Sequence, residues 1–481
     1  MASSIRHVTS GFRSEASQRW VAATPRSAQY GQYLSKSQVN HYASPSEEAV
    51  ASVLSWLESQ GLTFSSLSPA GDWISVKATV GQANRLFQAE FKRYKAEGLA
   101  DPVIRTLSYV IPEMVKDHIA SVHLTTVFLE IGNQRTQVAK NVTLARSSDD
   151  DDSAHLFQRD EPNNIPPSCI AGPEDDPAAR DKPYSLPCRF DLYGVPHSTV
   201  GSPVKENSLW MSGYNDEFAN RNMAKNYLQS WRPDLVGREM FGLVTVTGGL
   251  NNQLPLGAAV FPVRSPPNVL VGDWPIAEFR VDAAPARSLC NSYAQLAARG
   301  VTIVFPVMPD GVGLSKQADT SCPKFYVPFP ASCPYVTAVG ASSVSKDGTF
   351  EQISSSNTGG FSTHFPRPVY QDIEYLQALE DGVYEGMYDP SGRAIPDVSP
   401  HQYWTMGSGE PFAFGSESFS TYFFGGIVAL LNEELISAGR PTLDFLNTLI
   451  YQNLDAFNDF TTGNNPGCET RVSMQPSAGI L

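Results

Sequence analysis

The chain has 481 residues, of which 41% are hydrophobic, so it is long enough to hold two or more domains with substantial cores. Its formal net charge of -14 argues against a protein that binds nucleic acid or an anionic membrane surface. The longest apolar run lies around residues 423–431 and is too short to span a bilayer. The first residues lack the apolar core of a secretory signal, so none is predicted in this sequence.

The first 129 residues alternate between helical and strand patterns. Ser46 precedes two glutamates and an apolar run with helical spacing, which predicts a capped helix over residues 46–57. The remaining predicted elements of this part, in chain order, are a strand at 73–80, a helix at 82–87, a strand at 106–110 and a helical turn from 112 to 115. Helices and strands joined by short turns predict a small two-layer α/β domain.

Residues 130–167 differ in composition from the domain before them. Four consecutive aspartates, at 149–152, form a run of like charge that cannot be buried. Asn163 and Asn164, followed by Pro166 and Pro167, add turn and stiff-chain residues. This segment is predicted to be a solvated linker that proteases can reach.

The part from residue 168 to 481 has the pattern of a larger α/β domain. Residues 241–246 and 301–305 are nearly continuous β-branched and aromatic runs, as buried parallel strands require. A helix is predicted over 287–298, before the second of these strands, and another over 423–437, where Gly439 and Pro441 follow.

Ser418 lies in the segment 415–422, which stands immediately before the apolar helix predicted at 423–437. A serine at the start of a buried helix can act as an exposed nucleophile, because the helix N-terminus stabilises anionic intermediates. The alternative is that Ser418 is only the N-cap of a core helix.

The six cysteines all lie between Cys169 and Cys468. An even number is compatible with disulfides in an oxidising compartment, and free thiols in a large domain are the alternative. No Cys-x-x-Cys or His-Glu-x-x-His pattern occurs, so no zinc site is predicted.

Several segments match the pattern of one family, in the same order along the chain. In the N-terminal part they are residues 30–35, 68–74 and 105–109. In the C-terminal part they are residues 290–301, 329–340, 359–368, 396–398 and 456–459. On these residues the chain resembles the sedolisin family of serine-carboxyl peptidases, in its tripeptidyl-peptidase branch.

The resemblance implies a proenzyme with two folded parts. Residues 1–129 resemble an activation prodomain with a small, ferredoxin-like α/β fold, which acts as an intramolecular inhibitor and folding aid. Residues 130–167 would be the linker that is cut on activation. Residues 168–481 resemble a subtilisin-like peptidase domain with a central, mostly parallel sheet. The implied activity is proteolysis of peptides and proteins at acid pH, outside the cell.

The family's catalytic residues are only partly matched by this chain. Ser418 falls in register with the nucleophile, counted back from Leu430-Leu431-Asn432. Alanine and proline occupy the positions of the family's Glu-x-x-x-Asp acid pair, and the same spacing recurs at Glu278 and Asp282. Glu278 and Asp282 are expected as the acid pair if this stretch fills the place of a segment missing between residues 253 and 266. The alternative is that they are only an exposed charged pair on a helix or loop. Asp310 is expected as the oxyanion acid, one place after the matching position.

The family's calcium site is also only partly matched. Asp459 corresponds to a carboxylate ligand and Phe460 to a backbone-carbonyl ligand. Calcium takes six or more oxygen ligands, so these two residues give an incomplete Ca²⁺ site.

Two functional hypotheses follow. The first is a peptidase proenzyme, and the alternative is a catalytically inactive pseudopeptidase that binds peptides or a partner. Loss of the acid partners of a serine nucleophile costs several orders of magnitude in rate, which favours the alternative if the acid pair is absent. A third possibility is that the segment is missing because the exon boundaries of the gene are wrong.

Overall fold

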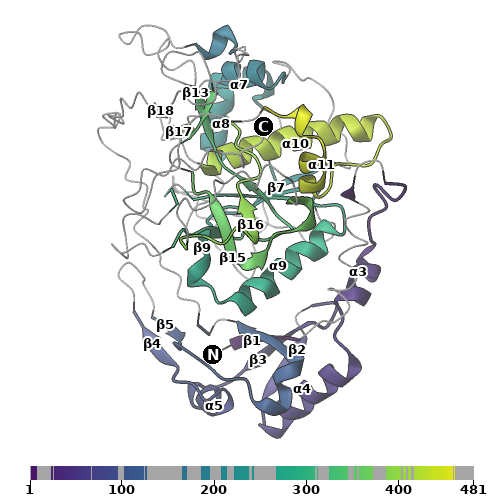
Figure 1. Ribbon diagram of the computed structural model, residues 1–481, viewed down its shortest axis with the longest axis vertical. Helices are drawn as coiled ribbons and strands as arrows, with labels where there is room; N and C mark the ends of the chain where they lie inside the picture. The colour runs from purple at the N-terminus through teal and green to yellow at the C-terminus, as the bar shows by residue number, and fades with distance from the viewer. Residues whose placement is uncertain are drawn as a thin grey trace. The chain divides into compact units, whose positions relative to one another are not determined.

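The computed structural model in Figure 1 describes part of the chain, and every structural statement below concerns that part. It comprises residues 2–7, 23–24, 27–66, 68–95, 102–123, 125–126, 165–170, 186–195, 207–213, 221–237, 241–242, 267–308, 311–312, 324–344, 351–354, 357–371, 386–401, 405–407, 410–412, 417–458 and 460. Within it, no helix has the length and apolarity needed to cross a membrane.

The chain divides into two compact units. Unit 1 consists of Met1–Arg19, Leu34–Phe157 and Phe279–Gln295, and unit 2 consists of Trp20–Tyr33, Gln158–Glu278 and Leu296–Leu481. The predicted boundaries at residues 129 and 167 place residues 20–33 in the first domain and residues 279–295 in the last. In the structure, residues 20–33 group with unit 2 and residues 279–295 with unit 1.

Unit 1 is built on a four-stranded antiparallel sheet in the order β2-β3-β1-β6. These strands are β1 (Ala2–His7), β2 (Thr63–Ser66), β3 (Trp73–Lys77) and β6 (Ile119–His123). The other elements of this part are α3 (Lys36–Ala43), α4 (Glu47–Ser59), α5 (Val80–Leu86), β4 (Lys92–Tyr94), β5 (Val103–Arg105) and the 3₁₀ turn η1 (Glu113–His118). In chain order the main elements are β1, α4, β2, β3, α5 and β6, which is the ferredoxin-like order β-α-β-β-α-β. The predicted fold of the first domain is therefore confirmed.

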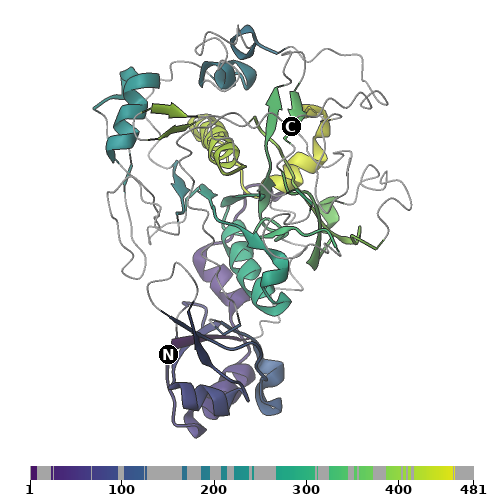
Figure 2. The ribbon, with the colours of Figure 1, turned by 90° about the vertical axis from the view of Figure 1, so that its left-hand side faces the viewer.

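The core of this sheet lies on the face that α4 and α5 cover, as Figures 1 and 2 show. Along β3, Ile74 and Val76 are buried, whereas the alternate residues are not. The same apolar cluster includes residues of α4, α5 and β6, namely Val53, Trp56, Leu57, Leu86 and Val122. Burial of each such side chain stabilises a fold by about 1.5–3 kcal/mol.

Local side-chain chemistry sets the ends of two of these helices. The Ser46 hydroxyl accepts a hydrogen bond from the Ala49 N–H at 3.1 Å, so α4 begins where the sequence predicts. Thr79 Oγ1 accepts from the Gln82 N–H at 3.2 Å, and Gln82 Oε1 accepts from the Thr79 N–H at 2.9 Å. This capping box starts α5 at Val80, so the strand predicted over 73–80 ends at Lys77.

The strand predicted at 106–110 is wrong. The Thr106 N–H donates to the Thr125 carbonyl and the Val110 N–H donates to the Phe87 carbonyl, so the backbone bonds of this stretch go to separate partners rather than to one neighbouring strand. Leu107 is 77% exposed. The hairpin strand β5 instead occupies Val103–Arg105.

Unit 2 contains a four-stranded sheet in the order β12-β10-β8-β7, in which all three neighbouring pairs are parallel. The strands are β7 (Leu209–Met211), β8 (Val269–Val271), β10 (Thr302–Pro306) and β12 (Thr337–Val339). Every residue of β8, β10 and β12 is buried, as expected for a parallel sheet covered on both faces. The α/β class, the parallel sheet and the strand predicted at 301–305 are confirmed, whereas residues 243–246 of the other predicted strand lie outside the described residues.

The long helix α10 (Glu417–Ser437) packs on this parallel sheet. Phe424 and Val428 join an apolar cluster with Val269 and Val271 of β8. A Cβ added to Gly425 would lie 2.4 Å from Val271 Cγ2, so glycine is needed for this close approach. The helix ends at Ser437, as predicted, but begins at Glu417 rather than Phe423.

The helix predicted at 287–298 is α9 (Ala283–Ala297), which begins four residues earlier. The Asp282 carbonyl accepts from the Ala286 N–H at 3.0 Å, so the first turn starts after Asp282. Pro285 is compatible with this turn, because the N–H that proline lacks has no helical partner there.

Smaller elements complete the described part. The helices and 3₁₀ turns are η2 (Pro167–Cys169), α7 (Leu186–Leu192), α8 (Arg221–Trp231), η4 (Pro233–Leu235), η5 (Glu278–Arg280), η6 (Val369–Gln371), α11 (Leu446–Gln452) and η8 (Leu454–Ala456). The strands pair as β9 (Ile276–Ala277) with β11 (Pro328–Phe329), β13 (Ser342–Val344) with β14 (Glu351–Ile353), β15 (Gly360–Pro366) with β16 (Gly392–Ile395), and β17 (Thr405–Gly407) with β18 (Glu410–Phe412).

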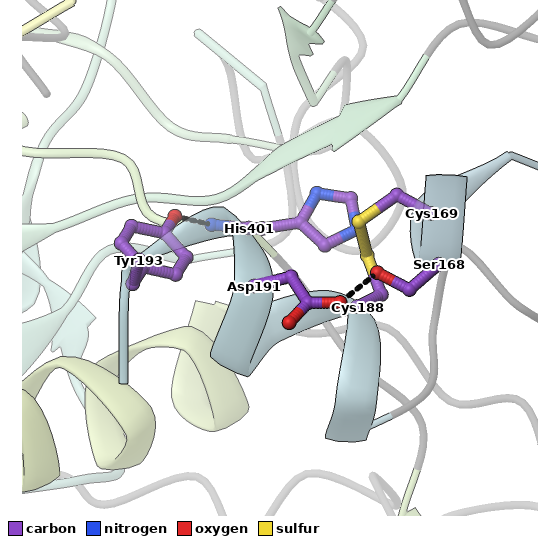
Figure 3. The surroundings of a disulfide bond; sticks show 6 residues. All are labelled: Ser168, Cys169, Cys188, Asp191, Tyr193 and His401. Atoms are coloured by element: carbon purple, nitrogen blue, oxygen red, sulfur yellow. Dashed lines mark hydrogen bonds between the residues drawn. A yellow bond between two sulfur atoms is a disulfide. The ribbon is translucent and has the colours of Figure 1, made fainter. Parts of the chain in front are cut away.

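A disulfide joins Cys169 and Cys188 at the start of unit 2 (Figure 3). Beside it, the Ser168 hydroxyl donates to the Asp191 carboxylate at 2.5 Å. The backbone N–H of His401 donates to the Tyr193 hydroxyl at 2.7 Å. Cys290 and Cys333 each take part in a disulfide as well. For these four cysteines the structure decides between the two alternatives in favour of disulfides.

Candidate functional site

Ser418 lies in the first turn of α10 and is partly buried. It is the second residue of the helix, so it is a helical residue rather than the N-cap. The N–H groups of a first helical turn have no partner within the helix, and the helix dipole places partial positive charge there. The position therefore suits a group at which negative charge develops during a reaction.

The hydrogen-bond partner of Ser418 is Asp273, a residue that the sequence analysis did not single out. The Ser418 hydroxyl donates to Asp273 Oδ1 at 2.8 Å, and the Tyr422 hydroxyl donates to Asp273 Oδ2. Asp273 is only 7% exposed. Burial raises the pKa of its carboxyl, and the hydrogen bonds from Tyr422, Ser418 and the Trp274 N–H oppose this rise without cancelling it.

A sequence signal for Asp273 was present. It comes two residues after the buried strand β8, and polar groups at the carboxyl ends of parallel strands commonly form the sites of α/β proteins. The match of Glu278 and Asp282 to the expected acid spacing drew the prediction to those residues instead.

Glu278 is buried, with 2% exposure, and its carboxylate is fully engaged elsewhere. Its Oε1 accepts from the Ser362 hydroxyl at 2.5 Å. Its Oε2 accepts from the Thr363 N–H at 2.7 Å and from the Thr363 hydroxyl at 3.0 Å. These bonds attach the turn η5 to strand β15.

Asp282 is exposed, and its Oδ2 accepts from the Thr126 hydroxyl at 2.8 Å. The carboxylates of Glu278 and Asp282 therefore have separate partners among the described residues. Their role as an acid pair for Ser418 stays a prediction. Asp282 directly precedes α9, whereas Glu278 lies in a separate 3₁₀ turn, so the spacing of four does not place them on one helical face.

The other predicted site residues fall at or beyond the edge of the described part. Asp310, expected as the oxyanion acid, and Asp459, expected as a calcium ligand, lie outside it, as does the stretch 253–266. Phe460 is described, and its side chain is buried. Among the described residues, no group of three or more His, Cys, Asp or Glu side chains is arranged to hold a metal ion.

Comparisons with known proteins find matches both to the N-terminal part by itself and to most of the chain. Residues 15–128 match the family model described as the Pro-kumamolisin activation domain. Over 95% of its length the chain is 29% identical to tripeptidyl-peptidase SED3 of Arthroderma otae, of which it covers 82%. It is 27% identical to tripeptidyl-peptidase SED4 of the same organism over 93% of the chain and 79% of that protein. A probable tripeptidyl-peptidase SED3 of Trichophyton verrucosum is 28% identical, with 93% and 80% covered.

The solved structures that match are more distant. Pseudomonas sedolisin, a serine-carboxyl proteinase, is 20% identical with a TM-score of 0.32, over 41% of this chain and 56% of that one. The epidermin leader peptide processing serine protease of Staphylococcus aureus is 10% identical with a TM-score of 0.37, over 97% and 94%. The relationship therefore rests on the sequence matches. The chain is similar in sequence to these tripeptidyl-peptidases over most of its length, and residues 15–128 match a Pro-kumamolisin activation domain.

Proposed function

We propose that this protein is the proenzyme of a serine peptidase that releases tripeptides from the N-termini of peptides at acid pH, with Ser418 as the nucleophile. The observation that carries the proposal is the position of Ser418 in the first turn of α10, with its hydroxyl 2.8 Å from a buried carboxylate. A carboxylate beside the nucleophile, rather than a histidine, suits proton transfer in acid solution.

The N-terminal part would keep the peptidase inactive until the linker at 130–167 is cut. The match of residues 15–128 to an activation domain supports this role. The disulfide between Cys169 and Cys188 supports maturation in an oxidising compartment, as expected for a secreted protein. Calcium binding through Asp459 and the Phe460 carbonyl remains part of the proposal, and no step of the reaction depends on it.

A pseudopeptidase is the second candidate. It is favoured by the bonds of Glu278 and Asp282 to separate partners, because those bonds do not join the two carboxylates into an acid pair. Such a protein would bind peptides without cleaving them.

One experiment separates the two candidates. The full chain is produced under oxidising conditions and assayed at a series of pH values from about 4 to 6, where carboxylates titrate. Cleavage within 130–167 is followed by mass spectrometry, and turnover is followed with a tripeptide arylamide that has a free N-terminus. The N-acetylated arylamide serves as the control for release of tripeptides from free N-termini.

The variant Ser418→Ala should abolish both reactions, whereas Ser437→Ala, which changes an exposed serine at the other end of α10, should preserve them. A folded wild-type chain with an intact linker and no turnover would refute the peptidase and leave the pseudopeptidase.

A further inference from the structure

Asp273 is held in place by the backbone on both sides of it. The Gly272 N–H donates to the Val304 carbonyl of β10 at 2.9 Å, which continues the parallel ladder beyond β8. A Cβ on residue 272 would lie 2.0 Å from the ring of Phe305, so glycine lets the chain pass over that buried ring. The next residue, Trp274, has a φ of 56°. A non-glycine residue in this conformation is strained, and such strain is found preferentially at functional sites.

The carboxylate of Asp273 has a hydrogen-bond donor at each oxygen. Oδ1 accepts from the Ser418 hydroxyl at 2.8 Å and from the backbone N–H of Trp274 at 2.7 Å. Oδ2 accepts from the Tyr422 hydroxyl. Ser418 and Tyr422 are four residues apart on α10, so they project from the same face of the helix. One carboxylate is thus fixed between a candidate nucleophile and a phenol.

We propose that Asp273 is the proton acceptor of Ser418, in the role that the resemblance assigns to an acid pair, and that Tyr422 positions it. This inference rests on the proposed function. Asp273 Oδ1 lies within the distance that a general base needs from the proton it removes. The hydrogen bond from Tyr422 fixes the second oxygen and leaves Oδ1 directed at the nucleophile.

The proton balance of the reaction is complete with these groups. Ser418 Oγ forms a bond to the scissile carbonyl carbon, its proton moves to Asp273 Oδ1, and the carbonyl π electrons move to the carbonyl oxygen. When the tetrahedral intermediate collapses, the C–N bond breaks and Asp273 gives the proton to the leaving amine. Water then attacks the acyl-enzyme and gives a proton to Asp273. That proton returns to Ser418 Oγ as the peptide acid leaves.

The base must be ionised to accept a proton, which fixes the sign of the pH dependence. Burial is the main influence on the pKa of Asp273 and raises it, while the Tyr422 and Ser418 hydroxyls and the Trp274 N–H lower it. The neighbouring acid on α10, Glu417, is also buried. kcat/KM should therefore fall on the acid side at a pH above about 3.9, the ordinary value for an aspartate.

The test uses the full chain after linker cleavage and the tripeptide arylamide. Asp273→Asn should lower kcat/KM by about 10²- to 10⁴-fold, the usual contribution of a general base. Asp273→Ala should show a similar loss that formate partly restores, because a small carboxylate can occupy the space left by the side chain. Thermal unfolding of each variant shows whether it is folded, and rescue by formate would not occur if Asp273 only stabilised the fold.

Tyr422→Phe provides a readout specific to positioning. Loss of the phenol removes a hydrogen bond that lowers the pKa of Asp273, so the acid limb of kcat/KM should move to higher pH by about 1 to 2 units. Asp282→Asn removes the exposed carboxylate of the acid pair predicted from sequence and should change kcat/KM less than tenfold.

The outcomes distinguish the two proposals. A folded wild-type chain without turnover overturns the proposed function and this inference together. Turnover that is lost in Ser418→Ala but stays within tenfold of wild type in Asp273→Asn overturns the inference alone. A loss in Asp282→Asn as large as that in Asp273→Asn also overturns it, in favour of Glu278 and Asp282.

Discussion

The buried ion pair between Arg393 and Asp397 gives the sharpest prediction about stability. Both side chains are fully buried, and Arg393 Nη2 lies 2.5 Å from Asp397 Oδ2. Burial is the largest single influence on the pKa of the Arg393 guanidinium and lowers it, but Asp397, Tyr370 and Tyr451 together outweigh it, so the net shift is upward. The guanidinium therefore stays charged, and the Asp397 carboxylate lies beside it.

Asp397 also accepts hydrogen bonds from several surrounding elements. Its Oδ2 accepts from the Ala338 N–H at 2.7 Å and from Asn447 Nδ2 at 3.3 Å, and its Oδ1 accepts from the Tyr451 hydroxyl at 2.9 Å. These donors belong to β12 and α11. Removal of the carboxylate would leave a buried cation and several donors unsatisfied at once.

Asp397→Ala should therefore lower the free energy of unfolding by about 3–5 kcal/mol, the cost of removing one partner of a buried pair. Urea unfolding of the full chain, followed by tryptophan fluorescence, measures this loss. The matched control is Asp455→Ala at an exposed aspartate, which should change the free energy of unfolding by less than about 0.5 kcal/mol. The double variant Arg393→Met with Asp397→Leu should be more stable than Asp397→Ala, because no unpaired charge remains.

A loss of less than about 1 kcal/mol in Asp397→Ala would refute this reasoning, since a buried cation without compensation cannot be that inexpensive. Equal stability of Asp397→Ala and the double variant would show that the cost comes from lost packing rather than from the unpaired charge.

Two further predictions concern the packing and the covalent bonds of unit 2. Gly425→Ala should destabilise the protein by about 1–3 kcal/mol, because the new Cβ meets Val271. Gly426→Ala should stabilise it by about 0.5–1 kcal/mol, because the new Cβ would have no atom within 4 Å. Urea unfolding measures the difference, and equal effects would contradict the packing of α10 on β8. Cys169→Ser with Cys188→Ser should cost about 3 kcal/mol of the free energy of unfolding, because the disulfide closes a loop with a sequence separation of 19; an unchanged urea midpoint would contradict this.

Elements with a strong local signal were predicted from sequence. The Ser46 cap and helical spacing placed α4, and the β-branched run before Pro306 placed β10. The end of α10 followed from Gly439, whose φ of 67° suits glycine. Ser418 was located through the ordered motifs around it, and the comparisons support the family to which those motifs point.

Other elements had no local signal of this kind. β1 (Ala2–His7) lies at the centre of the antiparallel sheet, between β3 and β6, yet no strand was predicted there. Its place is set by pairing with strands about 70 and 115 residues away along the chain, which no window of sequence contains. α10 begins six residues before its predicted start because Glu417, Ser420 and Thr421 are buried by tertiary contacts, although they lack an apolar pattern.

The sequence by itself determined the α/β class, the presence of an activation domain before a peptidase-like domain, and the candidate nucleophile, because each is written in patterns or motifs of neighbouring residues. Only the tertiary structure decided which carboxylate meets that nucleophile. Asp273 and Ser418 are 145 residues apart, and the packing of α10 on β8 brings Asp273 Oδ1 and the Ser418 hydroxyl to 2.8 Å. Glu278 and Asp282 have the right spacing, but the turn before α9 gives their carboxylates separate partners. Spacing along a chain identifies a pair only where one regular helix holds both residues.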